Sequence, residues 1–172
     1  TAWLEKSAFG FDDVAVADIT TSNNGLEIVF AGFDGRIHAV DSVANELWST
    51  AFTSSDRVLT SGVVIADLSG DGSPEIVFNS YSPDDDVSSL FVYDANGVEL
   101  HRVPLTGRGA MPVPTVADVN GDGQLEIVVS LKDGTTGISQ ALVYTVPGSS
   151  TNCLPWPTGR GGYSRSGQYY PN

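Results

Sequence analysis

Basic residues and long apolar runs are both scarce in this sequence. Only 8 Lys and Arg residues accompany 21 Asp and Glu residues, which gives a net charge of −13. Contacts with nucleic-acid phosphates need clustered basic side chains, so no nucleic-acid partner is expected. No apolar run reaches the roughly 18 residues that would indicate a membrane-spanning helix. The carboxylates are therefore in excess, and bound cations would offset their mutual repulsion.

Cysteine is nearly absent, because Cys153 is the only one, and this excludes a disulfide within the chain. Two interpretations stay open for it: a small buried thiol, or a disulfide with a residue outside this sequence. The chain begins Thr1-Ala2-Trp3, with neither an initiator methionine nor a signal peptide, which is typical of a processed or excised product. Its 172 residues, 41% of them apolar, suit one domain with a sizeable core.

Amphipathic helical patterns are absent as well, and a repeat is present instead. The apolar runs do not exceed about eight residues and are separated by turn residues, which favours strands. An acidic loop that leads into an apolar run occurs three times, beginning at Asp18, Asp67 and Asp118. These aspartates are 49 and 51 residues apart (67 − 18 and 118 − 67). A period near 50 indicates a repeat architecture.

Each repeat is expected to contain short antiparallel strands. The first predicts strands over 14–19, 26–31, 36–41 and 45–50. The second predicts strands over 63–68, 74–79, 90–94 and 99–103, with an insertion over 80–88. The third predicts strands over 114–119, 125–129 and 140–146, and its fourth strand is missing or degraded.

Four-stranded units at this period are typical of β-propeller blades. We therefore predict an all-β fold with about three four-stranded antiparallel blades over residues 1–150, an incomplete ring. Ala2-Trp3-Leu4 is expected to take the place of a fourth strand from a preceding repeat, since Trp3 precedes its acidic loop as Trp48 does. Three blades leave two faces uncovered, so missing blades are expected from an upstream segment or another chain, with self-association as the alternative.

The tail over residues 151–172 is rich in Gly, Arg and aromatic residues and shows no periodicity. It is expected to form an irregular C-terminal strap across the propeller, with Trp156 and the tyrosines filling grooves. An aromatic patch that contacts a ligand is the alternative.

Two of the acidic loops carry the ligand pattern of a calcium site. Calcium prefers six to eight oxygen ligands, and a glycine allows a short loop to turn sharply around the ion. In the second loop the expected ligands are Asp67, Ser69, Asp71, the carbonyl of Ser73, and Glu75. In the third loop they are Asp118, Asn120, Asp122, the carbonyl of Gln124, and Glu126. The sequence therefore predicts two Ca²⁺ sites.

The first loop departs from this pattern. Asp18 and Glu27 are 9 residues apart, against 8 in the other two loops (27 − 18, 75 − 67 and 126 − 118), and no acid lies between them. Thr20, Ser22 and the pair Asn23-Asn24 stand there instead. A weak third calcium site and an amide-capped turn without metal both stay open.

EF-hand loops begin in the same way, but they continue into a helix and place a glutamate at position 12. In the third loop positions 10 to 12 are Ile127, Val128 and Val129, which favour a strand. The second and third loops instead resemble the calcium loops of FG-GAP/VCBS repeats, the blades of integrin-α-like β-propellers, over roughly residues 2–146. This resemblance implies a secreted, extracellular or periplasmic propeller with calcium between the first two strands of a blade.

The stretch from Asp34 to Trp48 is also similar to blades of quinoprotein-type propellers, but no cofactor-binding set accompanies it. No catalytic residue is predicted. His38 and His101 lie on predicted strands without a nucleophile motif and are expected to be structural. The acid runs Asp12-Asp13 and Asp84-Asp85-Asp86 are expected to be solvated loop charge, with cation binding as the alternative.

The expected function is a non-catalytic, calcium-binding module for adhesion to a protein or glycan, or for assembly. Two alternatives remain: the propeller portion of a secreted carbohydrate-active enzyme such as a polysaccharide lyase, and an accessory subunit of an exported complex. Whether the parent protein is an enzyme stays open.

Overall fold

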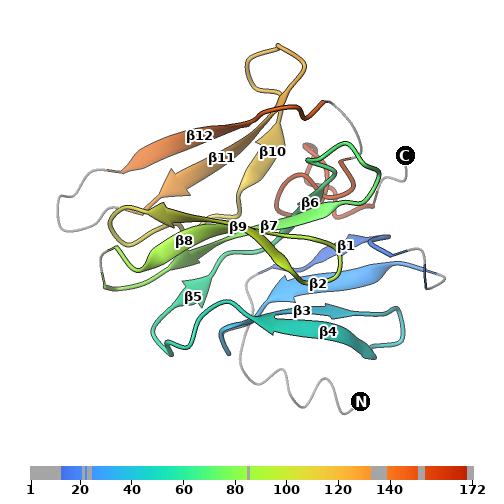
Figure 1. The fold of residues 1–172 in the computed structure, drawn as a ribbon, viewed down its shortest axis with the longest axis horizontal. Coiled ribbons are helices and arrows are strands. Elements are labelled where there is room, and N and C mark those ends of the chain that lie inside the picture. The colour runs from blue at the N-terminus through green and yellow to red at the C-terminus, as the bar shows by residue number, and fades with distance from the viewer. Residues whose placement is uncertain are drawn as a thin grey trace.

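Three antiparallel sheets form the computed structural model, which describes residues 13–20, 22, 25–84, 86–132, 139–150 and 154–169 (Figure 1). The first sheet has the order β1 (Ala15–Ala17), β2 (Glu27–Ala31), β3 (Arg36–Val40), β4 (Glu46–Ala51). The second has the order β5 (Leu59–Thr60), β7 (Glu75–Tyr81), β8 (Ser88–Tyr93), β9 (Glu99–Leu105), and β6 (Val64–Ala66) also pairs with β7. The third has the order β10 (Thr115–Ala117), β11 (Leu125–Leu131), β12 (Gln140–Val146). No helix occurs among the described residues, so the all-β prediction is confirmed.

The expectation of four strands in each unit is wrong for the second sheet. The added strand β5 has only two residues, which pair with Ser80 and Tyr81, and it is too short to show a pattern in the sequence. Strands β7 and β8 also extend into the predicted insertion, because serines continue the pairing there: the Ser89 N–H donates to Ser80 Oγ (2.8 Å). The third sheet has three strands within the described part of the chain, as predicted.

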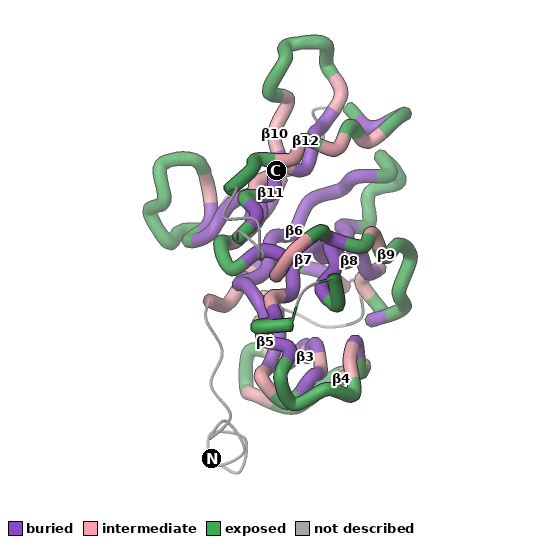
Figure 2. Tube along the Cα trace, turned by 90° about the vertical axis from the view of Figure 1, so that its left-hand side faces the viewer, coloured by how far each residue is buried: buried purple, intermediate pink, exposed green. Residues whose placement is uncertain are grey.

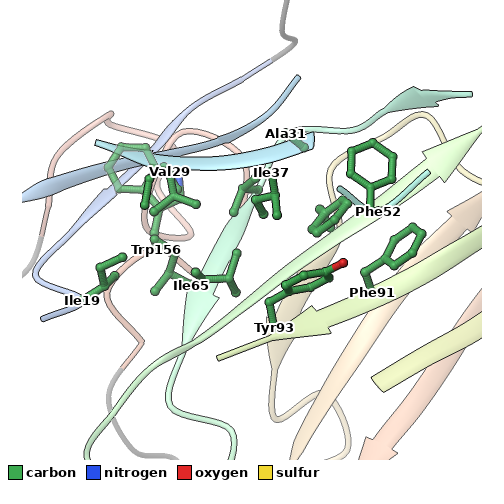
Figure 3. Close-up of a cluster of buried hydrophobic side chains, with 14 of the residues drawn as sticks. Ile19, Val29, Ala31, Ile37, Phe52, Ile65, Phe91, Tyr93 and Trp156 are labelled. Carbon is green, nitrogen blue, oxygen red and sulfur yellow. The ribbon is translucent and has the colours of Figure 1, made fainter. Parts of the chain in front are cut away.

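The second sheet lies between the other two (Figure 1). Successive strand residues point to opposite faces, so β6, β7 and β8 of this sheet each contribute to two cores. On one face Phe78 and Tyr93 pack with Val29 and Ile37 of the first sheet (Figure 3). On the other face Val77 packs with hydrophobic residues of the third sheet. Strands β6, β7 and β8 of the middle sheet are accordingly buried almost throughout (Figure 2).

The short strands β1, β6 and β10 come together at one side of the molecule. Gly62 lies two residues before β6 and has no space for a side chain: an added Cβ would lie 2.5 Å from Cβ of Asp13 and 2.9 Å from Cγ2 of Val113. The start of β6 is therefore enclosed by the residues that precede β1 and β10.

The C-terminal segment lies along these short strands. The Trp156 N–H donates to the Ile65 carbonyl (3.0 Å) and the Ile65 N–H donates to the Trp156 carbonyl (2.8 Å). The Val116 N–H of β10 donates to the Pro157 carbonyl (2.9 Å), and the Tyr163 hydroxyl donates to the Val116 carbonyl (2.8 Å). The Trp156 side chain is buried in the core between the first and second sheets (Figure 3). The segment thus ties β6 to β10.

Trp48 on β4 fixes the junction between the first and second sheets. Its Nε1–H donates to the Ala95 carbonyl (3.0 Å), and the neighbouring Thr50 hydroxyl donates to the Gly97 carbonyl (2.8 Å). Gly97 has a φ of 79°, and a Cβ there would lie 2.5 Å from Cε3 of Trp48. The hairpin between β8 and β9 therefore requires glycine at this position for two separate reasons.

Replacement of Gly97 by alanine is expected to lower the free energy of unfolding by about 2–3 kcal/mol, from left-handed backbone strain plus overpacking against Trp48. Gly148 offers a matched control, because its φ is 83° and no atom lies within 4 Å of an added Cβ. Gly148→Ala is expected to cost only the backbone strain, about 1 kcal/mol. Urea unfolding of both variants measures the difference, and equal costs would contradict the role of Trp48.

Several predicted features lie outside the described residues, among them Ala2-Trp3-Leu4, Asp12, Asp85 and Cys153.

Candidate calcium loops

The third loop, between β10 and β11, folds around the carboxylate of Asp118. Its Oδ1 accepts the N–H of Gly121 (2.7 Å) and of Asp122 (3.2 Å), and its Oδ2 accepts the N–H of Gly123 (2.9 Å). Gly121 and Gly123 have φ values of 80° and 86°, which are strained for other residues. Asp122 in turn accepts the N–H of Gln124 (2.8 Å). One aspartate thus organises the backbone of the loop.

Three predicted ligands of this loop converge on one point. The Asn120 Nδ2 donates to Asp122 Oδ2 (3.1 Å) and to Glu126 Oε1 (3.2 Å). The hydrogens of this amide place partial positive charge between two carboxylate oxygens. A hard cation would be attracted to the same position, so the donor set of the third loop fits calcium.

The second loop, between β6 and β7, repeats much of this geometry. Asp67 Oδ1 accepts the Gly70 N–H (2.7 Å), and its Oδ2 accepts the Gly72 N–H (3.1 Å). Asp71 accepts the N–H of Ser73 (2.8 Å), as Asp122 does for Gln124. The hydroxyl of Ser69, at the position of Asn120, lies 3.5 Å from Asp67 Oδ1. Serine is shorter than asparagine, so the second loop has fewer side-chain contacts across it.

A glutamate at the start of the following strand closes each of the three loops. Its Oε2 accepts the backbone N–H of the residue after the leading aspartate: Ile19 to Glu27 (2.9 Å), Leu68 to Glu75 (2.6 Å) and Val119 to Glu126 (3.0 Å). All three glutamates are buried, with exposed fractions of 1%, 6% and 1%. Burial raises the pKa of Glu75, an effect only partly offset by the N–H groups of Leu68 and Ser69. The sequence predicted two of these glutamates as ligands and missed this capping role.

The first loop retains its glutamate cap without the inner acids. The Thr20 and Ser22 hydroxyls are hydrogen-bonded to each other (2.8 Å), and the Ser22 N–H donates to Thr20 Oγ1 (3.2 Å). Asp18 is exposed to solvent. Asn23 and Asn24, which were considered as ligands or caps, lie outside the described residues.

Glu27→Gln is expected to raise the free energy of unfolding at pH 7 by up to about 1 kcal/mol in calcium-free buffer. Burial raises the pKa of Glu27 above its ordinary value of 4.5, the Ile19 N–H opposes that rise, and the charge of Asp18 adds to it. A raised pKa means that this carboxyl stabilises the fold below about pH 4.5 and loses that contribution as the pH rises through its folded pKa. Glutamine can still accept the Ile19 N–H.

The gain in free energy of unfolding from Glu27→Gln should therefore fall towards zero as the pH is lowered to about 4. The native carboxyl is then protonated, and so it is neutral like the glutamine. Thermal melts of the native chain and the variant from about pH 4 to pH 8 measure this dependence. A gain that is constant over this range would contradict the effect of burial on Glu27.

Among the described residues, no group of three or more His, Cys, Asp and Glu side chains that could hold a metal ion occurs. Calcium loops also use amide, hydroxyl and backbone oxygens, so carboxylates alone do not decide the fit. The convergence of Asn120, Asp122 and Glu126 is the feature of this structure that fits such an ion.

Other residues considered from the sequence have local structural contacts. His38 Nε2 lies 3.1 Å from Asp34 Oδ2, and its Nδ1 lies 3.3 Å from Glu46 Oε2. The His38 ring also stacks on Phe30, with ring centroids 4.9 Å apart. These contacts hold the imidazole in a fixed position on the first sheet.

In the predicted acid run, Asp84 pairs with Arg57 (3.0 Å) and Asp86 accepts the Gly107 N–H (2.9 Å). Both partners of the Asp84 pair are more than half exposed, so the pair contributes little to stability. These contacts agree with solvated loop charge.

A polar cleft of about 860 Å³ lies beside the first and second loops. Asp18, Asp71 and Asp94 contribute carboxylates to its lining, and Tyr169 of the C-terminal segment contributes an aromatic ring. The cleft therefore combines acidic, hydroxyl and aromatic groups from the first repeat, the second repeat and the C-terminal segment.

Comparisons of the chain with family models and with curated protein sequences find no match. Within the described ranges, no helix has the length and apolar character needed to cross a membrane.

Proposed function

We propose that the chain is a three-blade portion of a calcium-stabilised β-propeller of the FG-GAP/VCBS type. The observation that carries this proposal is the glutamate cap, which closes the same loop in all three sheets. The strand register also recurs, because these glutamates pair with Ala17, Ala66 and Ala117 in turn. One loop geometry repeated in stacked antiparallel sheets supports related blades over unrelated sheets.

Calcium has a structural role in this proposal. Asp67, Ser69, Asp71, the Ser73 carbonyl and Glu75 bind one ion, and Asp118, Asn120, Asp122, the Gln124 carbonyl and Glu126 bind a second. Each ion neutralises carboxylates that otherwise repel one another, and so fastens the first two strands of a blade. Loops of this charge suit the higher calcium concentration outside cells, which supports a secreted, extracellular or periplasmic protein.

The outer face of the third sheet supports a role in assembly. Ala39 of the first sheet and Val92 of the second face the next sheet and are 0% and 6% exposed. Val143 of β12 pairs with Val128 as Val92 pairs with Val77, yet it is 54% exposed. A further blade packed on this face would bury Val143. Missing blades from an upstream segment or another chain are therefore the proposed partners, and the module binds or assembles without catalysis.

Native mass spectrometry tests this function directly. We expect two calcium ions per chain at about millimolar calcium. Asp67→Asn and Asp118→Asn should each remove one ion, and a co-purifying chain should be present in samples from the natural source. Failure to bind any calcium would overturn the proposed site.

The polar cleft favours a second candidate function, the propeller portion of a secreted carbohydrate-active enzyme such as a polysaccharide lyase. Carboxylates, hydroxyls and an aromatic ring are groups that bind sugars, and Asp71, Asp94 and Tyr169 bring them together. A glycan screen combined with an assay for unsaturated sugar products separates the two functions. Glycan binding without product formation would leave the binding module as the better description.

A further inference from the structure

Trp48 of β4 and His101 of β9 occupy the same position in their sheets. Trp48 pairs with Ala39 and His101 pairs with Val92, and in both cases the register shifts by one residue at the next pair. Both partners belong to the core that faces the next sheet. His101 therefore faces the junction between the second and third sheets (the second junction), as Trp48 faces the junction between the first and second sheets (the first junction).

The two junctions are filled differently. At the first junction the Trp48 indole covers Gly97 and donates to the Ala95 carbonyl, and Thr50 binds the same hairpin. At the second junction His101 replaces the indole and Val103 replaces Thr50, because β9 is equivalent to β4. Imidazole is smaller than indole, and valine cannot donate a hydrogen bond.

The second junction contains a cleft of about 400 Å³ at this position. Its lining is largely apolar, with Leu100, Val103, Ile127, Tyr144 and Pro147 around His101. Clefts that bind small ligands typically have volumes of about 300–1,000 Å³, apolar walls and a few polar groups. The titratable side chains in this lining are those of Glu75, His101 and Tyr144.

We propose that this cleft binds a planar aromatic ligand of about the size of an indole, in the position equivalent to the Trp48 ring. Tyr144 provides an aromatic surface for the ring, and Leu100 and Pro147 provide apolar contacts. His101 is exposed, so its ring lies within reach of a ligand that enters from solvent. A free small molecule and a tryptophan side chain of a polypeptide share this chemistry.

NMR titration of the full chain with indole tests the proposal. We expect saturable shifts of the Leu100, Val103 and Ile127 resonances, with a Kd on the order of 1 mM for a ligand this small. A parallel titration with N-acetyltryptophanamide separates the two sources. Binding of both probes identifies a tryptophan side chain as an acceptable occupant, and binding of indole alone identifies a free small molecule.

His101→Trp and His101→Ala form a matched pair. The tryptophan should fill the cleft, raise the melting temperature and weaken indole binding at least about tenfold, whereas the alanine leaves the cleft open and should weaken binding less than the tryptophan does. Absence of saturable shifts in the native chain up to about 10 mM indole would overturn the proposal. Undiminished binding to His101→Trp would overturn it as well, because the ligand would then occupy another place.

Discussion

Chelation of calcium with excess EGTA is expected to lower the thermal midpoint of this protein by about 10–20 °C relative to about 1 mM calcium. An ion that binds only the folded state stabilises it by about 2.7 kcal/mol when its concentration is 100 times its Kd. Two such ions contribute about 5 kcal/mol, and a chain of this size shifts by about 2–4 °C per kcal/mol. Calorimetry in the two buffers measures the shift.

Matched variants assign this effect to the loops. The double variant Asp67→Asn, Asp118→Asn should melt at the same temperature with and without calcium. Asp41→Asn is the control, because Asp41 accepts the N–H of Val43 (2.9 Å) and of Asn45 (2.8 Å) in the hairpin between β3 and β4. Loss of the Asp41 carboxylate should lower the thermal midpoint equally with calcium and with EGTA. A midpoint of the native chain that EGTA leaves unchanged would contradict the calcium sites.

The strands were predictable where apolar residues continue over a full strand. Ile76 and Phe78 face one core while Val77 faces the other, so both faces of β7 are apolar and the run is clear in the sequence. The end of β7 and the start of β8 were missed, because serines there replace apolar residues. Ser80 satisfies both the N–H and the carbonyl of Ser89 through its hydroxyl, so polar residues continue the sheet.

Long-range contacts were beyond the reach of local patterns. The hydrogen bonds between Ile65 and Trp156 join segments that are 91 residues apart (156 − 65). Neither segment contains a residue that specifies the other. The sequence predicted that Trp156 fills a groove, but the groove that it fills is defined by the first two sheets together.

The loop residues were predictable because their spacing is local. Every second position of the loop carries one of the predicted ligands, Asp118, Asn120 and Asp122. The sequence alone therefore places their side chains on one side of the turn. The role of Glu27 was available in the same sequence: it persists in a loop that has lost its inner acids. A glutamate retained without the other ligands indicates a role that does not depend on the ion, and in the structure this role is to cap the backbone.

The cleft at His101 could also have been found from the repeats. Aligning Leu47-Trp48 with Leu100-His101 shows that an indole in one unit becomes an imidazole in the next. The consequence for packing needed the structure, because it depends on what Tyr144 and Pro147 of the third sheet place opposite His101.

Trp156→Ala is expected to lower the free energy of unfolding by about 3–5 kcal/mol, the usual cost of removing a buried large aromatic side chain. Trp156 is 5% exposed and packs with the core between the first and second sheets, in the vicinity of Val29 and Ile65 (Figure 3). The backbone of Trp156 is paired with β6, so the vacated space cannot close without disturbing that pairing. Urea unfolding followed by far-ultraviolet circular dichroism measures the loss.

Trp156→Phe separates ring burial from hydrogen bonding. The Nε1–H of Trp156 is buried and has no hydrogen-bond partner among the described residues, so phenylalanine removes no hydrogen bond and also removes an unsatisfied donor. We expect this variant to lose no more than about 1.5 kcal/mol, since relief of the unsatisfied donor offsets part of the lost volume. Equal losses for alanine and phenylalanine would show that stability depends on the indole nitrogen. A loss below about 1 kcal/mol for alanine would show that the C-terminal segment rests on the sheets without stabilising them.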